Sequence, residues 1–235
     1  MDFASKFEVF WELFIEQGGW KRVLSVGLVN TLLIAVLGLL IGIILGTLIG
    51  AVKVMPKYKL LPRILDKICT LYVGFFRGTP IVVQLLIAYY VLWPLIGINI
   101  SSLNTSIIVF GLNSAAYVSE IMRGGILSVD PGQMEAGRAL GLSYSTTMMK
   151  IIIPQAIKNI LPTLGNEFIA LIKDTSVVSF VAATDLYKTF TEIGNVRYEY
   201  FMPYLAMALM YIILVFIISC GIKLMERSLR KSDRN

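Results

Sequence analysis

The chain has 235 residues, of which 57% are hydrophobic and only 15% are charged. A soluble domain carries about 25% charged residues, so this composition excludes an ordinary soluble enzyme and predicts an integral membrane protein. The chain contains no histidine and only two cysteines, both inside apolar runs, which excludes histidine-dependent catalysis and gives no sign of a disulfide or a metal site.

Residues 1–22 are predicted to form an interfacial segment that precedes the first membrane span. Aromatic side chains recur there at helical spacing, with acidic side chains opposite. Such a helix lies along a membrane surface, and a simple extension of the first span is the alternative. A cleaved signal peptide is not expected, because acids precede an apolar run too long for one. The aromatic residues are Phe3, Phe7, Phe10, Trp11 and Phe14, and the acids are Asp2, Glu8, Glu12 and Glu16.

Long stretches without charge predict an all-α integral membrane protein with five transmembrane helices within residues 23–222. About 20 helical residues cross the roughly 30 Å apolar core of a bilayer. Residues 64–77 are too few to span alone, so they are joined to 80–93 as one interrupted helix. The predicted spans are residues 23–52, the interrupted helix 64–93, the part of the uncharged run 78–119 that follows a turn at 97–104, residues 158–183 and residues 202–222.

The lysine and arginine residues predict the orientation of these spans. They gather in the loops after the first and third spans and in the segment 223–235, whereas the opposite side carries few of them among many acids. The positive-inside rule therefore places the N-terminus outside, the C-terminus inside, and residues 223–235 as a basic cytoplasmic tail. The net charge of +6 follows from this topology, so no nucleic-acid partner is expected.

Residues 129–154 are predicted to form a cytoplasmic loop of two short helices. Asp130 is expected to cap a helix beginning at Pro131, and Gly141 to end it in a left-handed turn. Ser143 is expected to cap a second helix, which Pro154 closes where the fourth span begins. Small residues at 136, 137 and 139 on the loop surface would admit close approach by another protein. An ordinary connection has only about 4–6 residues, so this loop indicates a specific role.

The same loop resembles the EAA loop of ABC importer permeases. Glu135-Ala136-Gly137, three residues, Gly141, nine residues and Ile151-x-Ile153-Pro154 follow the family pattern, with Gly137 in place of alanine and Ile153 in place of leucine. Further segments resemble the polar amino-acid uptake subfamily, whose members include glutamine, histidine, arginine and cystine permeases. These segments are RGTP at 77–80, NSAAYVSEIMRGG at 113–125, VDPGQMEAGRALG at 129–141, IIPQAIKNILPTLGNEF at 152–168 and KDTSVVS at 173–179.

The resemblance implies the type I ABC importer permease architecture and a multi-pass location in a bacterial plasma (inner) membrane. In that family the EAA loop docks on a cytoplasmic ATPase, which here assigns coupling to Glu135, Ala136, Gly137 and Gly141. The chain has no phosphate-binding loop, so ATP and magnesium are expected on the partner ATPase, and neither a cofactor nor an enzymatic activity on this chain. The implied partners are two ATPase subunits, an extracellular or periplasmic substrate-binding protein, an amino-acid substrate and a second permease subunit. A homodimer is preferred, and a heterodimer stays open.

Ionisable groups at membrane depth are candidates for the substrate site, because each costs about 2.5–3.5 kcal/mol at the centre of a span. Arg77 lies beside a predicted helix break, since Pro80 pushes the backbone of Thr79 out of the helical region. Pro80 is expected to begin a half-helix whose free N–H groups, together with Arg77, suit a substrate carboxylate. A structural ion pair from Arg77 to Glu120 or Asp174 is the alternative, and both roles can hold.

A polar stripe on the third predicted span supplies more candidates for the substrate site. Asn113, Tyr117 and Glu120 follow one another at intervals of four and three residues, so they share one helix face. Ser114 lies beside this stripe.

A second polar stripe lies on the fourth predicted span. Glu167 and Asp174 are two helical turns apart on one face. Asp174 is favoured for contact with a substrate amine, because it lies deeper in the membrane and next to Thr175 and Ser176. Those two residues and Asn113 are expected to add hydrogen bonds to the substrate. Glu167 is also assigned to the site, with a structural ion pair to Arg138 or Lys158 as an alternative role.

The predicted function is the permease subunit of an ATP-driven importer for a polar amino acid, which forms the translocation path and couples it to a separate ATPase. An ion-coupled secondary amino-acid transporter is the alternative, but the few spans, the lack of internal repeats and the loop at 129–154 count against it. A membrane scaffold without transport is a third hypothesis, for which buried Arg77 and Asp174 would be an unexplained cost.

Overall fold

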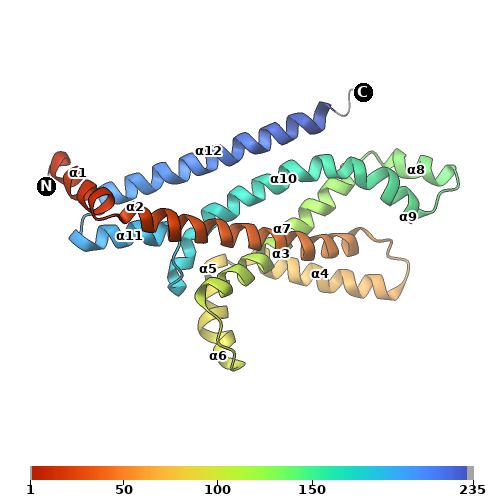
Figure 1. Cartoon of the computed structure of the whole chain (residues 1–235). Helices are drawn as coiled ribbons and strands as arrows, with labels where there is room; N and C mark the ends of the chain where they lie inside the picture. The colour runs from red at the N-terminus through yellow and green to blue at the C-terminus, as the bar shows by residue number, and fades with distance from the viewer. Residues whose placement is uncertain (1, 232–235) are drawn as a thin grey trace.

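The computed structural model describes residues 2–231, with side chains through residue 229, and within that range the chain is helical and contains no strand. The helices, as labelled in Figure 1, are α1 (Phe3–Trp11), α2 (Gly19–Arg22), α3 (Val29–Val54), α4 (Leu60–Gly78), α5 (Ile81–Ile87), α6 (Trp93–Leu95), α7 (Ser102–Leu127), α8 (Pro131–Ala139), α9 (Tyr144–Thr147), α10 (Ile153–Asp174), α11 (Leu186–Arg197) and α12 (Phe201–Lys231).

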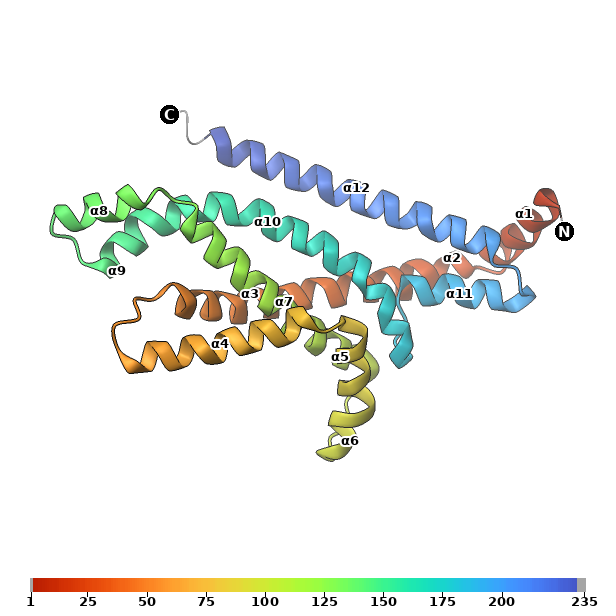
Figure 2. The ribbon, with the colours of Figure 1, turned by 180° about the vertical axis from the view of Figure 1, so that it is seen from behind.

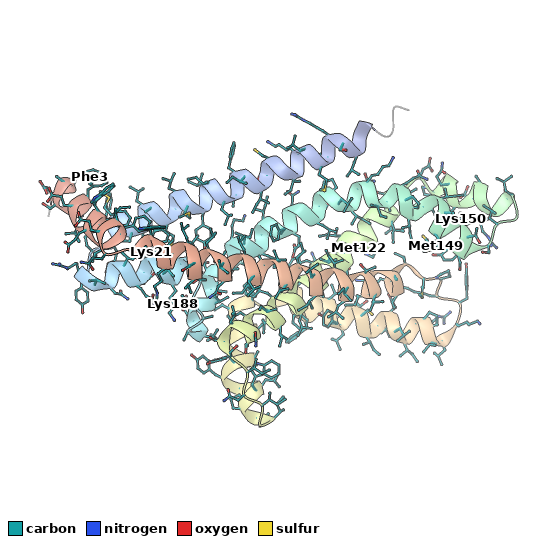
Figure 3. The ribbon with its side chains drawn as sticks, in the orientation of Figure 1. Phe3, Lys21, Met122, Met149, Lys150 and Lys188 are labelled. Carbon is teal, nitrogen blue, oxygen red and sulfur yellow. The ribbon has the colours of Figure 1, made fainter. Side chains whose placement is uncertain are left out.

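Most of the long helices lie along a common direction (Figures 1 and 2). One end of this bundle carries α8 and α9, where Met149 and Lys150 lie, and the other end carries α1 and α11, where Phe3 lies (Figure 3). Among the described residues, Gly19–Val54, Ser102–Leu127 and Phe201–Leu229 are long and apolar enough to cross a membrane, and the bent pair α4–α5 adds a fourth if it counts as one span. Helix α10 is long enough but not apolar enough to join them.

Four glycines, one at every fourth position of α3, let α7 pack closely against it. Gly38, Gly42, Gly46 and Gly50 are buried, and a Cβ atom on Gly46 would lie only 2.7 Å from the Cβ of Val118. Lipid tails offer helices no hydrophobic gain for associating, so close van der Waals contact along such a seam stabilises the pair. The facing residues of α7 are Phe110, Ser114, Val118 and Met122, at the same four-residue spacing.

The predicted break after Arg77 is present, but it is a sharp corner. Thr79 has extended dihedral angles (φ −120°, ψ 143°), and α4 and the helical run from α5 to α6 meet at 103°. The two parts of the predicted interrupted helix therefore do not share one axis, because two consecutive extended residues, Thr79 and Pro80, turn the chain aside. Pro80 precedes α5 rather than beginning it.

Two details of the fourth predicted span differ from the expectation. Pro154 does not close a helix. A π-helical turn over Met148–Ile152 leads directly into α10, and this wider turn tolerates the loss of the hydrogen bond that proline, which has no N–H, cannot donate. At the far end, α10 stops at Asp174 and a 3₁₀ segment, Thr175–Val181, leaves its axis. Val178 and Val181 of that segment are buried in one cluster with Leu85 of α5.

The N-terminal segment forms a helix of its own rather than an extension of the first span. Gly18 adopts a left-handed conformation (φ 75°), and a continuous helix runs from Gly19 to Val54, so the boundary lies four residues before the predicted one at 22/23. Two ion pairs hold this part of the chain to α11, one of them between Arg22 and Glu192 at 2.8 Å. At the other terminus, the predicted tail begins as a continuation of α12, and residues 232–235 lie outside the described part.

Candidate functional site

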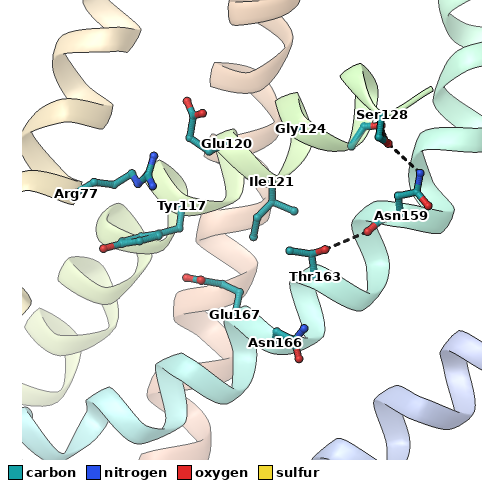
Figure 4. Close-up of a pocket in the computed structure, with 11 residues that line it drawn as sticks. Arg77, Tyr117, Glu120, Ile121, Gly124, Ser128, Asn159, Thr163, Asn166 and Glu167 are labelled. Carbon is teal, nitrogen blue, oxygen red and sulfur yellow. Dashed lines mark hydrogen bonds between the residues drawn. The ribbon is translucent and has the colours of Figure 1, made fainter. Parts of the chain in front are cut away.

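A polar groove runs between the end of α4, the middle of α7 and α10. It contains two cavities, one of about 460 Å³ beside the α4–α5 corner and one of about 630 Å³ that extends toward α8 and α9 (Figure 4). Arg77, Tyr117 and Glu167 line both cavities, so these three residues mark the place where the cavities meet. The structure thus brings residues of both polar stripes and of the helix break to one groove.

Arg77 contacts an aromatic ring rather than a carboxylate. Its guanidinium carbon lies 5.3 Å from the centroid of the Tyr117 ring, within the range of a cation–π contact. The ion pairs of the described residues do not include Arg77, so the alternative expectation of a pair with Glu120 or Asp174 is not met. The charge of Arg77 therefore remains available to an anionic group in the groove.

Glu167 is positioned by a neighbouring hydroxyl group. The Oγ of Ser114, a buried residue of α7, donates to Oε1 of Glu167 at 3.3 Å. Ser114 faces Gly42, where a Cβ atom would come within 2.5 Å of that Oγ, so the glycine seam fixes the hydroxyl. Arg138 does not pair with Glu167, since it lies in the loop and donates to the backbone oxygen of Leu142. Asp174, on the same face of α10, lines the cavity beside the α4–α5 corner.

Glu120 lines the larger cavity, but two cations occupy its carboxylate. Lys53, at the end of α3, lies 2.5 Å from Oε1, and Arg123 lies 2.9 Å from Oε2. A carboxylate with both oxygens paired gains little from a further cation, so Glu120 serves mainly to join α3 to α7. Lys53 was not among the predicted site residues, because it is far from Glu120 in the sequence.

The α4–α5 corner is held by side-chain amides. The Nε2 of Gln84 donates to the backbone oxygens of Phe76 (2.9 Å) and Thr79 (3.0 Å), which have no helical partner at the break. Asn113 donates to Oε1 of Gln84 at 3.0 Å and to the oxygen of Phe76 at 3.2 Å. The amide of Asn113 thus supports the corner. Gln84 was not among the predicted site residues, although an amide within the apolar run 81–93 was a usable signal.

Thr79 lines the smaller cavity, whereas Thr175 and Ser176 line neither. The hydroxyl of Thr79 donates to the oxygen of Phe75 and accepts from Gln84. The hydroxyl groups of Thr175 and Ser176 donate to the backbone oxygens of Ile172 and Lys173, three residues earlier in each case. Such bonds favour the 3₁₀ segment that follows α10.

The loop at the other end of the groove has the predicted turn geometry. Asp130 accepts from the N–H of Gly132 at the start of α8, and Ser143 accepts from Thr146 at the start of α9. Gly141 is left-handed (φ 80°), with hydrogen bonds from Leu142 to the oxygen of Gly137 and from Gly141 to that of Arg138. This pair of bonds is a Schellman motif, which ends a helix at a glycine.

The surface of this loop differs from the expectation at one position. Glu135 and Ala136 are exposed, but Gly137 is buried, and a Cβ atom there would lie 2.5 Å from Cγ2 of Thr147. Gly137 is therefore a packing position between α8 and α9, which explains a glycine in place of alanine. Leu140, 82% exposed, is the apolar residue that this turn presents instead.

Residues 38–231 match the family described as the binding-protein-dependent transport system inner membrane component. The chain belongs to this family. The permease is 40% identical over 166 residues to the arginine transport system permease protein ArtQ of Bacillus subtilis (71% of this chain, 76% of the relative). It is 37% identical over 220 residues to the L-cystine transport system permease protein TcyB of the same species (93% and 91%).

Solved structures agree with this assignment. The permease superposes on the crystal structure of an amino acid ABC transporter with histidines with a TM-score of 0.81 and 37% identity, covering 97% of this chain and 99% of that one. An inward-facing MetNI methionine ABC transporter gives a TM-score of 0.72 at 20% identity, covering 86% and 94%, and supports the fold alone. The predicted ABC permease resemblance and a transport role, rather than an enzymatic one, are thereby confirmed, and none of these relatives supports an ion-coupled transporter.

Proposed function

We propose that the permease is a subunit of an ATP-driven importer for a polar amino acid, and that the groove between α4, α7 and α10 is its path. The observation that carries this proposal is the presence of both charges in one groove. Arg77 suits a substrate carboxylate, while Asp174 and Glu167 suit an ammonium group. Relatives named for arginine and cystine transport support an amino-acid substrate.

In the proposed topology the chain crosses a bacterial plasma membrane five times, with its N-terminus outside and its C-terminus inside. Helix α10 is the polar crossing, because the face that lowers its hydropathy lines the groove rather than facing lipid. The clustered lysines and arginines near the α8–α9 end support a cytoplasmic location for that end.

The loop formed by α8 and α9 is proposed to dock on a partner ATPase, which holds ATP and magnesium. Exposed Glu135 and Ala136, together with Leu140 at the Gly141 turn, would form the contact, and buried Gly137 would keep the two short helices packed. The hydroxyl of Tyr144 donates to the backbone oxygen of Val54 at 3.3 Å, so a movement of the loop reaches α3 directly.

A second permease subunit is proposed to cover the open side of the groove, and an external binding protein to deliver the substrate. A homodimer is preferred, because one chain carries both the cationic and the anionic groups of the path.

Uptake by proteoliposomes that contain the permease and its ATPase tests the proposal. Uptake of a labelled amino acid should require internal ATP and the external binding protein, and should continue when ionophores abolish ion gradients. Uptake driven by a proton or sodium gradient without ATP would refute it.

The charge reversal Glu135→Arg tests the coupling contact. It should lower the ATPase activity stimulated by the binding protein to the unstimulated rate, because it places the opposite charge in the docking surface. Glu16→Arg, an exposed glutamate at the other end of the bundle, is the matched control. Unchanged stimulation in Glu135→Arg would exclude coupling through this residue.

A further inference from the structure

The N-terminal helix exposes an apolar stripe at the end of the bundle opposite α8 and α9. Phe3, Phe7, Trp11 and Ile15 follow one another at four-residue intervals and expose 65%, 47%, 47% and 39% of their surfaces. Four residues are close to one helical turn, so these side chains lie along one side of α1 and of the π-helical turn that follows it.

The neighbouring side of the same segment is fixed to the protein. Leu13 is buried, and the Phe14 ring stacks on Phe10 and on Phe190 of α11, with centroids 5.0 and 6.0 Å apart. Glu12 also pairs with Arg197 of α11 at 3.5 Å. The rest of the protein thus covers only part of the apolar surface of this segment. The exposed part is held in a defined orientation by the contacts on the covered side.

The stripe continues a surface that faces away from the protein. The ring of Phe3 packs edge-on against the ring of Phe201, the first residue of α12, with the ring centroids 6.4 Å apart. Phe201 is itself 51% exposed. None of the most apolar part of α12 is buried, and Leu205 and Leu209, the next residues at this spacing, are 56% and 57% exposed. Helices α10 and α11 cover one side of α12, and its exposed apolar side is surrounded by acyl chains in a bilayer. The stripe therefore lies at the edge of the region that α12 exposes to lipid.

The charged residues around the stripe have the arrangement of a membrane interface. The Nζ of Lys6 lies 4.9 Å from the Phe201 ring, and that of Lys21 lies 5.8 Å from the ring of Trp20. Such lysines extend their amines toward headgroups while their stems cover apolar surface. Glu8 and Glu16, eight residues apart, are exposed beside the stripe and direct charge to water.

We infer that the stripe Phe3–Phe7–Trp11–Ile15 binds a phospholipid surface, lying at the boundary between headgroups and acyl chains. Gly18, with its left-handed backbone, turns the chain there from the interface into the first span. The helix would anchor α11 and the start of α12 at a fixed depth. This inference does not depend on the transported substrate or on ATP coupling.

Nitroxide labels on the full-length permease in phospholipid nanodiscs test the inference. The native cysteines are first removed as Cys69→Ser and Cys220→Ser. Two neighbouring pairs are then labelled, Phe7→Cys with Glu8→Cys, and Ile15→Cys with Glu16→Cys. Collision rates are measured with oxygen, which concentrates in lipid, and with a water-soluble nickel chelate.

The labels at 7 and 15 should collide mainly with oxygen, and those at 8 and 16 mainly with nickel. Two pairs keep the test valid if one variant fails to fold. Nickel accessibility at 7 and 15 would show that the stripe faces water and would overturn the inference. Protection of these positions from both reagents would show a protein partner, such as a second copy or the binding protein, and would equally overturn it.

Discussion

The guanidinium group of Arg77 lies over the ring of Tyr117, 5.3 Å from its centroid, at the point where the two cavities of the groove meet. The contact joins the last turn of α4 to the middle of α7. It orients the charge without neutralising it, since an aromatic ring attracts a cation through its quadrupole and leaves the donor groups free.

Replacing the ring of Tyr117 should weaken substrate recognition through Arg77. An exposed cation–π contact contributes about 0.5–1 kcal/mol, so Tyr117→Leu should raise the KM of ATP-driven uptake about two- to fivefold. Tyr117→Phe keeps the ring and is the control, with a KM close to that of the unmodified protein. Equal effects of the two substitutions would show that the hydroxyl matters and the stacking does not.

Neutralising Asp174 should weaken uptake while leaving assembly with the ATPase intact. A charge-assisted hydrogen bond contributes about 1.5–3 kcal/mol, so Asp174→Asn should raise the KM about ten- to hundredfold. Lys173→Gln changes the adjacent charge, which lines neither cavity, and should have little effect. An unaltered KM in Asp174→Asn would remove this residue from the path.

Filling the seam between α3 and α7 should destabilise the protein. Gly46→Ala places a Cβ atom 2.7 Å from Val118 and 2.9 Å from the oxygen of Ala115, and such overpacking costs about 1–3 kcal/mol. Gly74→Ala, in α4, meets nothing within 4 Å and should be neutral or slightly stabilising, since alanine favours helix. Thermal unfolding of both purified variants in detergent measures the difference, and equal melting temperatures would contradict the seam.

An alanine at position 137 should perturb the loop formed by α8 and α9. Gly137→Ala brings a methyl group within 2.5 Å of Cγ2 of Thr147, and Thr147→Ala would remove that atom. The double variant should therefore recover much of the stability lost by Gly137→Ala, with an interaction energy of about 0.5–3 kcal/mol. Strictly additive losses in thermal unfolding would show that Thr147 does not restrict this position.

The stability of the segment that joins α10 to α11 should depend on pH through Asp185. This carboxyl caps α11, and its burial raises its pKa to about 6, although N–H groups of Lys188 and Tyr187 oppose the change. The folded protein therefore binds this proton more tightly than the unfolded chain does. Ionisation should lower the free energy of unfolding by up to about 3 kcal/mol as pH rises from about 4 to about 6. Unfolding of Asp185→Asn across this range should lack that slope, and parallel profiles of the two proteins would contradict the prediction.

Local sequence patterns predicted the helices and turns because each depends on residues a few positions apart. Asp130, Ser143 and Gly141 form their caps and turn through bonds that span two to five residues, so composition and spacing sufficed. The polar stripes of α7 and α10 were equally readable, because helical periodicity alone decides which side chains share a face.

Only the tertiary structure decided which of those side chains are available to a substrate. Glu120 is paired with Lys53, 67 residues away, and Asn113 supports the α4–α5 corner through Gln84, whereas Arg77 and Glu167 line the groove. These pairings depend on how closely α3 and α7 approach and on the 103° corner between α4 and α5. The sequence alone determined helices, faces and membrane character; distances between helices follow from packing across the chain, which no local pattern encodes.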